Sequence, residues 1–173
     1  VLPATTAEGP EVPMGRTRAL RIAGCIAAAL VAGSLSPAAF VVADSAKAER
    51  GRYLVQIAGC NDCHTPGYAS SQGKVDEQRW LTGDVLGFQG PWGTTYPPNL
   101  RRLAASLTVE DWLLAARRPM RPPMPWFVLR EMTDQDLAAI YHYIRTLGAA
   151  GPIAPAYAPP GQAVATPVVK FPE

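Results

Sequence analysis

The sequence lacks strong charge and repetition. Its formal net charge is +2 over 173 residues, and no block rich in lysine and arginine occurs. Proteins use such blocks to bind along a phosphate backbone, so nucleic acid is not expected as a partner. We find no internal repeat, and the length requires no more than one small globular domain with appendages. Eighteen prolines and fifteen glycines indicate that much of this domain is loop.

Cysteine and histidine are also scarce, with three and two residues respectively. A structural zinc site takes about four ligands, commonly two cysteine pairs or one cysteine pair with a histidine pair. Beyond residue 43 the candidates are Cys60, Cys63, His64 and His142, and the last lies far along the chain on a predicted helix. Zinc is therefore a poor fit.

A thiol–disulfide oxidoreductase would need a βαβ pattern around the cysteine pair, and no such pattern is seen. This function remains the alternative for a protein without haem.

The N-terminal part has the pattern of an export signal. A basic stretch follows Met14, an apolar run extends from Ile22 to Leu35, and small residues come next. This order is typical of a secretory signal peptide. We expect residues 1–43 to be an N-terminal extension and signal peptide with its start at Met14, cleaved after Ala43 or, as second choice, after Ala48. The mature protein would then be periplasmic.

An uncleaved anchor is the alternative for this segment. Residues Ile22 to Val42 are mostly apolar, and about 20 such residues are enough to span a bilayer. Ser34, Ser36 and Pro37 weaken this alternative. If the segment stays in place, the protein would be anchored to the membrane and face the periplasm. Cleavage would remove Cys25 and leave Cys60 and Cys63 with no third thiol.

The most specific motif is Cys60-Asn61-Asp62-Cys63-His64. Cys-x-x-Cys-His is the attachment sequence of a c-type haem. Two thiols on one turn can each bond a vinyl group of the same porphyrin, and the adjacent imidazole then lies under the iron. The motif predicts one covalent haem c, with Cys60 and Cys63 as thioethers and His64 as the proximal ligand.

Three helices are predicted from spacing and capping residues. The first runs from Lys47 to Gly59 and leads into the motif. A second opens at Thr108 and stops at Pro119, and a third runs from Thr133 to Leu147, with acidic residues after each threonine cap. Residues 65–107 show no sustained period and are expected to be loop. The proline-rich tail, residues 149–173, is expected to be extended.

The ligand on the second face of the haem decides between electron transfer and ligand chemistry. Met124 lies in Pro122-Pro123-Met124-Pro125-Trp126, where prolines restrict the backbone on both sides. We therefore predict Met124 as the distal ligand. Met120 is the main competitor, followed by His142 or an open site, whereas Met132 precedes a helix cap and is expected to pack against that helix.

In this order, the motifs resemble those of a class I cytochrome c, of the kind found with bacterial periplasmic dehydrogenases. The resemblance covers Lys47 to Gly148 and includes Leu81-Thr82-Gly83 and Tyr96-Pro97-Pro98-Asn99-Leu100. It implies an all-α fold for residues 44–148, with three or more helices and loops wrapped around one covalent haem. It also implies that the first and last helices cross near Gly51.

A haem iron held by His64 and Met124 suits an electron carrier rather than an enzyme. The expected function is passage of single electrons from a dehydrogenase-type donor to a respiratory acceptor, both of them redox protein partners. The alternatives are a haem-based gas-binding or sensory protein, and a haem subunit of an oxidoreductase complex.

Two groups of residues have open roles. Trp92, Tyr96 or Asn99 could donate hydrogen bonds to haem propionates, or simply pack in the core. Six arginines could form a basic ring for an acidic partner or merely be solvated. These arginines are Arg101, Arg102, Arg117, Arg118, Arg121 and Arg130.

Overall fold

The computed structural model describes the backbone of residues 37–172 and the side chains of residues 45–172. The expected signal segment lies almost entirely outside the described residues, so its cleavage stays a prediction. Within residues 37–172, no helix is both long enough and apolar enough to cross a bilayer.

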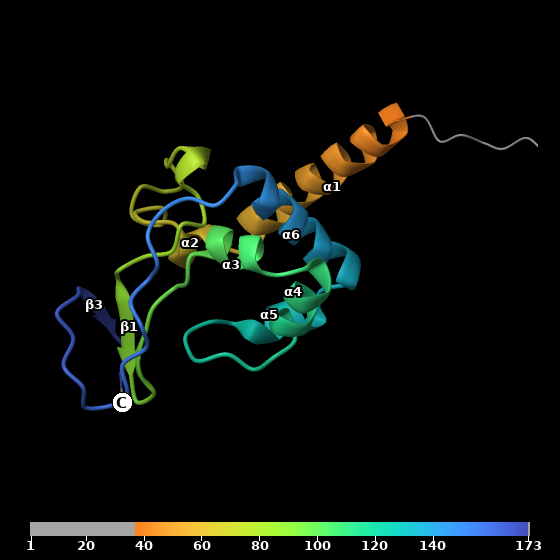
Figure 1. Cartoon of the computed structure of the whole chain (residues 1–173). Helices are drawn as coiled ribbons and strands as arrows, with labels where there is room; N and C mark the ends of the chain where they lie inside the picture. The colour runs from red at the N-terminus through yellow and green to blue at the C-terminus, as the bar shows by residue number, and fades with distance from the viewer. Residues whose placement is uncertain (1–36, 173) are drawn as a thin grey trace, which may run out of the picture. The chain divides into compact units, whose positions relative to one another are not determined.

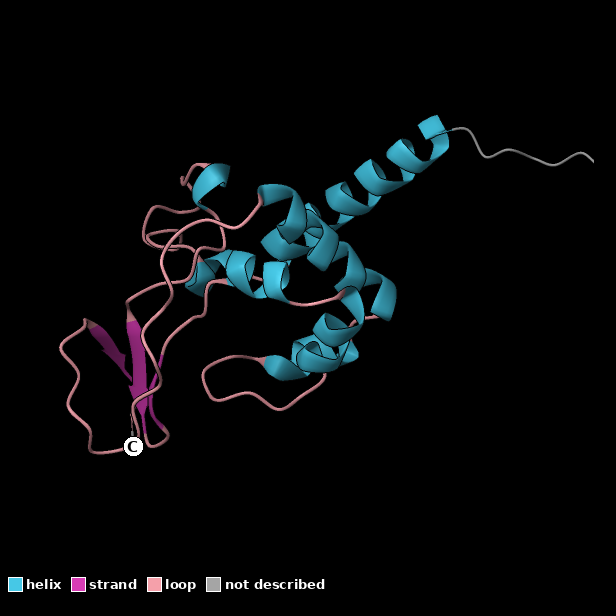
Figure 2. Ribbon diagram, viewed as in Figure 1, coloured by secondary structure: helices cyan, strands magenta, loops and turns pink. Residues whose placement is uncertain are grey.

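Helices dominate the described part of the chain, which confirms the helical fold class (Figures 1 and 2). A single turn of 3-10 helix, Glu77–Arg79, lies between the second and third α-helices. The six α-helices described are α1 (Pro37–Ile57), α2 (Cys60–His64), α3 (Leu100–Ser106), α4 (Val109–Ala116), α5 (Trp126–Glu131) and α6 (Asp134–Leu147).

Threonine caps begin α4 and α6, as the sequence predicts. The Thr108 hydroxyl accepts a hydrogen bond from the Asp111 N–H at 3.2 Å, and the Thr133 hydroxyl accepts one from the Asp136 N–H at 3.1 Å. Each bond satisfies one of the amides that the first turn of a helix leaves unpaired. Gly148 ends α6 with φ of +69°, a conformation that favours glycine. Both predicted helices are confirmed.

Other boundaries differ from the prediction. Helix α1 begins at Pro37 and not at Lys47, so it extends into the segment assigned to the signal peptide. Residues 65–107 are not all loop, because they contain α3, which Asn99 caps by accepting from the Arg102 N–H at 3.0 Å. Helices α3 and α5 have seven and six residues. Such short helices span two turns or fewer and show no clear period.

A small sheet adds to the helical fold and was not predicted (Figure 2). Its strands are β1 (Gly87–Gly90), β2 (Gly93–Thr95) and β3 (Val168–Lys170), in the order β2-β1-β3. Strands β1 and β2 form an antiparallel hairpin, whereas β3 runs parallel to β1. The proline-rich tail is extended as expected, and its end is fixed in this sheet.

Helices α1 and α6 pack against each other at Gly51 (Figure 1). A Cβ at this position would overlap the Ala139 carbonyl oxygen and would lie 2.7 Å from the Tyr143 Cβ. Only a glycine allows this approach of the two backbones. Val55 of α1 and Ile144 of α6 are fully buried. The predicted crossing of the first and last helices is confirmed.

The variant Gly51→Ala should lower the free energy of unfolding by about 3 kcal/mol, because the added methyl forces α1 away from α6. Denaturant titration of the purified protein measures this. Glu49→Ala, an exposed change on the same helix, is the control and should have little effect. Equal stability of the two variants would contradict the packing argument.

Arg101 is the least expected feature of the fold. It is only 4% exposed, and its guanidinium donates to the carbonyl oxygens of Gly148 at 2.5 Å, Gln78 at 2.7 Å and Leu147. The last carbonyls of a helix have no partner within the helix. Arg101 therefore caps the end of α6 and ties α3 to it.

Two other arginines of the expected basic ring, Arg102 and Arg117, are also engaged within the chain. Arg102 donates to the Gly151 carbonyl oxygen at 2.6 Å. Arg117 donates to the Leu129 carbonyl oxygen at 3.0 Å and pairs with Asp134 at 2.5 Å. Contacts inside the protein therefore account for much of this cluster.

The variant Arg101→Gln should be destabilised by about 3 kcal/mol, because it removes hydrogen bonds from a charged donor to buried carbonyls. Thermal and denaturant unfolding measure the loss. Arg118→Gln removes the same charge from an exposed side chain and should unfold like the wild type. A stable Arg101→Gln variant would show that the cap contributes little.

Candidate functional site

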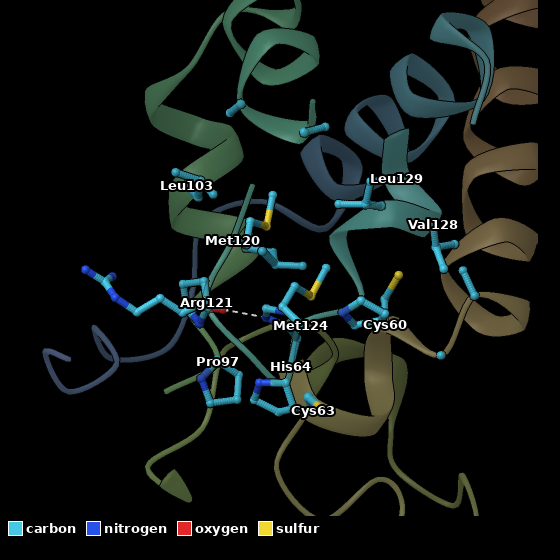
Figure 3. A pocket seen from close by; sticks show the side chains of 18 of the residues that line it. Cys60, Cys63, His64, Pro97, Leu103, Met120, Arg121, Met124, Val128 and Leu129 are labelled. Atoms are coloured by element: carbon cyan, nitrogen blue, oxygen red, sulfur yellow. Dashed lines mark hydrogen bonds between the residues drawn. The ribbon is translucent and has the colours of Figure 1, made fainter. Parts of the chain in front are cut away.

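One large cavity brings the predicted site residues together (Figure 3). Its volume is about 860 Å³, within the usual range for small-molecule and cofactor sites. Most of its wall is apolar. The wall comes from the end of α1, from α2, α3, α4, α5 and α6, and from the loops around residues 95–98 and 119–125.

His64 lines this cavity and is only 6% exposed. Its Nδ1 lies 2.9 Å from the carbonyl oxygen of Pro98. Because a carbonyl can only accept, Nδ1 carries the proton and donates it, and Nε2 is left with a lone pair. Burial lowers the pKa of His64, and the bond to Pro98 offsets this only in part. A neutral imidazole with one nitrogen held and the other free is the form that binds a metal.

Cys60 and Cys63 lie on the single turn of α2 and also line the cavity. Neither thiol is in a disulfide. Burial raises the pKa of Cys60 to about 11 and also raises the pKa of Cys63. Thiol–disulfide exchange proceeds through a thiolate, which redox enzymes favour by lowering this pKa. The surroundings of the pair therefore do not favour the oxidoreductase alternative.

A buried network holds α2 against the loop after it. The Thr65 hydroxyl donates to the Asn61 side-chain oxygen at 2.7 Å and accepts from the Leu81 N–H at 2.7 Å. The Gly83 N–H donates to the His64 carbonyl oxygen at 2.8 Å. A side chain at Gly83 would meet the backbone of residues 97–99. The segment Leu81-Thr82-Gly83 thus links the histidine to the loop that carries Pro98.

The variant Thr65→Val should lower the free energy of unfolding by about 2 kcal/mol, because the buried Leu81 N–H then has no acceptor. Denaturant titration measures the change. Ser70→Ala removes an exposed hydroxyl that bonds a local carbonyl, and it should cost much less. Similar losses for both variants would argue against the network.

Met124 and Met120 both lie in the loop between α4 and α5, and both side chains line the cavity (Figure 3). The Met124 N–H donates to the Arg121 carbonyl oxygen at 3.3 Å, and the Trp126 N–H donates to the Met124 carbonyl oxygen at 2.8 Å. These bonds form a tight turn around Met124. The structure therefore places both thioether candidates in the cavity that His64 lines.

The remaining candidates lie elsewhere. His142 is not among the residues that line the cavity, and its ring instead meets the Tyr141 ring at 5.5 Å between centroids. Met132 packs against the hydrophobic core, as predicted. Of the side chains considered as the distal ligand, Met124 and Met120 are therefore the two that line the cavity.

The three side chains whose role was left open between propionate binding and core packing already have other partners. Trp92 Nε1 donates to the Phe88 carbonyl oxygen at 3.3 Å, and the Tyr96 hydroxyl pairs with Thr166 at 2.5 Å. The amide nitrogen of Asn99 donates to two carbonyl oxygens of the tail, at 2.8 and 2.9 Å. For these three residues, the roles seen are in packing and loop structure.

Thr95 is a site residue that the sequence did not reveal. It lines the cavity, and within residues 45–172 its buried hydroxyl has no hydrogen-bond partner. Nothing in the local sequence distinguishes this threonine from its neighbour Thr94.

The residues around the cavity fit a covalently attached haem. The apolar wall suits a porphyrin, and His64 offers a free imidazole nitrogen on one side. Two unpaired thiols lie one turn apart, and two thioethers line the same space. The unpartnered hydroxyl of Thr95 suits a carboxylate of such a group.

Comparison with known proteins agrees with the fit of these residues to a covalently attached haem. The family model described as Cytochrome c matches residues 48–148. The chain is 28% identical over 125 residues to the cytochrome c subunit of alcohol dehydrogenase (quinone) from Gluconobacter oxydans (strain 621H). The aligned region covers 66% of this chain and 24% of that protein.

The chain is also 29% identical over 108 residues to the fructose dehydrogenase cytochrome subunit from Gluconobacter japonicus, covering 56% of this chain and 20% of that protein. It thus spans about a quarter or less of the length of these curated relatives. No solved structure matches the chain significantly.

Proposed function

Because this chain belongs to the cytochrome c family, we propose that it is an electron-transfer protein that carries one covalently bound haem c. It takes single electrons from a dehydrogenase-type donor and passes them to a respiratory acceptor. The chain acts as a carrier, alone or as a subunit of an oxidoreductase complex, and performs no substrate chemistry of its own.

In this proposal, Cys60 and Cys63 form the thioether bonds, His64 is the proximal ligand and Met124 is the distal ligand. The bound haem supplies an iron centre that gains and loses one electron. The hydrogen bond from His64 Nδ1 to Pro98 fixes the ring so that Nε2 is the only nitrogen available to a metal. The thiols need no activation toward disulfides in this role, in accord with their raised pKa values.

The observation that carries the proposal is the presence of a proline-framed methionine in the cavity that holds the motif. A carrier keeps the same two ligands in both oxidation states, so little rearrangement accompanies electron transfer. The prolines around Met124 limit the motion of its backbone. Ligation by a methionine together with a histidine would also raise the reduction potential, which suits a carrier that accepts electrons from a dehydrogenase.

Partner and location rest on different arguments. The two relatives named above are cytochrome subunits of dehydrogenases, which supports a dehydrogenase as the electron donor. The signal pattern in residues 1–43 supports a periplasmic location, with attachment through an uncleaved segment as the alternative.

Since several arginines of the expected ring are engaged within the chain, docking of a redox partner need not depend on an arginine ring.

The test is production in a host that attaches haem, followed by mass and optical measurement. We expect the mass of one haem and a charge-transfer band from methionine to ferric iron. Met124→Ala should lose this band and bind carbon monoxide readily in the reduced state, because it opens the sixth position.

Met120→Ala is the matched control, since Met120 lies in the same loop and lines the same cavity. It should keep the band. Loss of the band in Met120→Ala alone would show that Met120, and not Met124, is the distal ligand. Ready binding of carbon monoxide to the wild-type protein would instead favour a gas-binding haem protein, and the absence of covalent haem would overturn the proposal.

A further inference from the structure

Few polar side chains line the cavity, and most of them already have partners. His64 Nδ1 donates to Pro98, Trp112 Nε1 donates to the Leu137 carbonyl oxygen at 3.1 Å, and the Tyr96 hydroxyl pairs with Thr166. Apart from the two cysteines and His64 Nε2, which the proposed function already uses, this leaves the Thr95 hydroxyl and the Arg121 guanidinium as polar groups of the wall that are free to bind a ligand.

The Thr95 hydroxyl is buried with no partner among the described residues. Folded proteins satisfy nearly all buried polar groups. A hydroxyl on a cavity wall without a protein partner therefore points to an acceptor that occupies the cavity. A valine of the same shape would fill this position without the cost of an unpaired hydroxyl.

Arg121 also lines the cavity, and the carbon at the centre of its guanidinium lies 3.9 Å from the centroid of the Tyr157 ring. Within residues 45–172, this guanidinium has no hydrogen bond and no carboxylate partner. A guanidinium that lies on an aromatic ring keeps the N–H donors along its edge available, which is the geometry that binds a carboxylate. The Tyr157 hydroxyl donates to the Trp92 carbonyl oxygen at 2.8 Å, and this fixes the ring.

Thr95 and Tyr157 lie beside the same backbone contact. Thr94 and Ala158 form an antiparallel bridge, with N–H to oxygen distances of 2.7 and 3.0 Å. In an antiparallel pair, the residue after one partner and the residue before the other lie opposite each other, on the same face. Thr95 and Tyr157 hold these positions, so the ring that supports Arg121 lies on the face from which Thr95 projects.

The two donors are also on the correct side of the cavity for a propionate. In a porphyrin of the haem type, the vinyl and propionate groups leave from opposite halves of the ring. Figure 3 shows the Arg121 side chain extending away from Cys60 and Cys63. A haem fixed at the cysteines would therefore have its carboxylates at the end where Arg121 lies.

We infer that Thr95 and Arg121 bind a haem propionate, and that Tyr157 is a positioning residue that holds Arg121 in place. This inference rests on the proposed function, since it concerns the same cavity. Tyr157 lies outside residues 48–148, the part that matches the family. The tail therefore contributes a feature of the haem site that the family match does not cover.

The experiment compares haem-loaded variants by redox titration and by the propionate-bending band in resonance Raman spectra. Arg121→Gln should shift this band and lower the equilibrium constant for reduction by about threefold, because a cation near the haem disfavours the ferric state. Thr95→Val should shift the band with a smaller change in potential. Tyr157→Leu should change the potential in the same direction as Arg121→Gln, and Arg121→Lys should retain most of the wild-type potential.

Two matched controls separate this role from general effects. Arg118→Gln removes a nearby exposed charge that does not line the cavity, and Thr94→Val removes a hydroxyl that already pairs with Gln89. Both should keep the wild-type band. If haem is attached but Arg121→Gln and Thr95→Val behave like these controls, the inference is wrong and the proposed function stands. A wild-type protein without covalent haem would overturn both.

Discussion

The hydrogen bond from His64 Nδ1 to the Pro98 carbonyl oxygen, at 2.9 Å, determines how the rest of the site is arranged. An imidazole in a cavity can rotate about two bonds and can carry its proton on either nitrogen. A fixed acceptor on one nitrogen removes both freedoms. The other nitrogen then has one direction in which it can bind a group in the cavity.

Such a bond is useful only if the acceptor itself is held. Pro98 precedes Asn99, which caps α3 through its side-chain oxygen and holds the start of the tail through its amide nitrogen. Two residues later, Arg101 reaches the end of α6. The loop that faces His64 is thus fixed to a helix and to the core, although its own backbone forms few regular pairs.

Side chains also donate to backbone carbonyl oxygens elsewhere in the fold. Side-chain donors of Arg101 and Tyr141 reach the carbonyl oxygens of Gly148 and Leu107, residues that directly follow α6 and α3. Trp112 Nε1 donates to the Leu137 carbonyl oxygen of α6. Loops that surround a large apolar group cannot pair with one another across it. Their buried carbonyls still require donors, and long side chains supply them from the neighbouring helices.

The features that were predictable from sequence are those with a local signature. The motif at Cys60–His64 and the threonine caps of α4 and α6 each depend on residues close in the chain. The helix contact at Gly51 has no such local signature, and it was expected from the resemblance to class I cytochromes c. Helices α3 and α5 escaped prediction because two turns or fewer carry no clear period. The role of Arg101 was not predictable because a charged residue is usually exposed, and its carbonyl partners lie far away in sequence.

The tail shows why a part outside the family match can still shape the site. A two-stranded hairpin such as β1–β2 is at best marginally stable by itself, yet it leads directly into the cavity wall at Thr95. Strand β3 adds a third strand, and the Phe171 ring packs against the Trp92 ring at 5.4 Å between centroids. Since this wall depends on contacts from the tail, the tail belongs to the structure of the site as much as the loop that carries Met124 does.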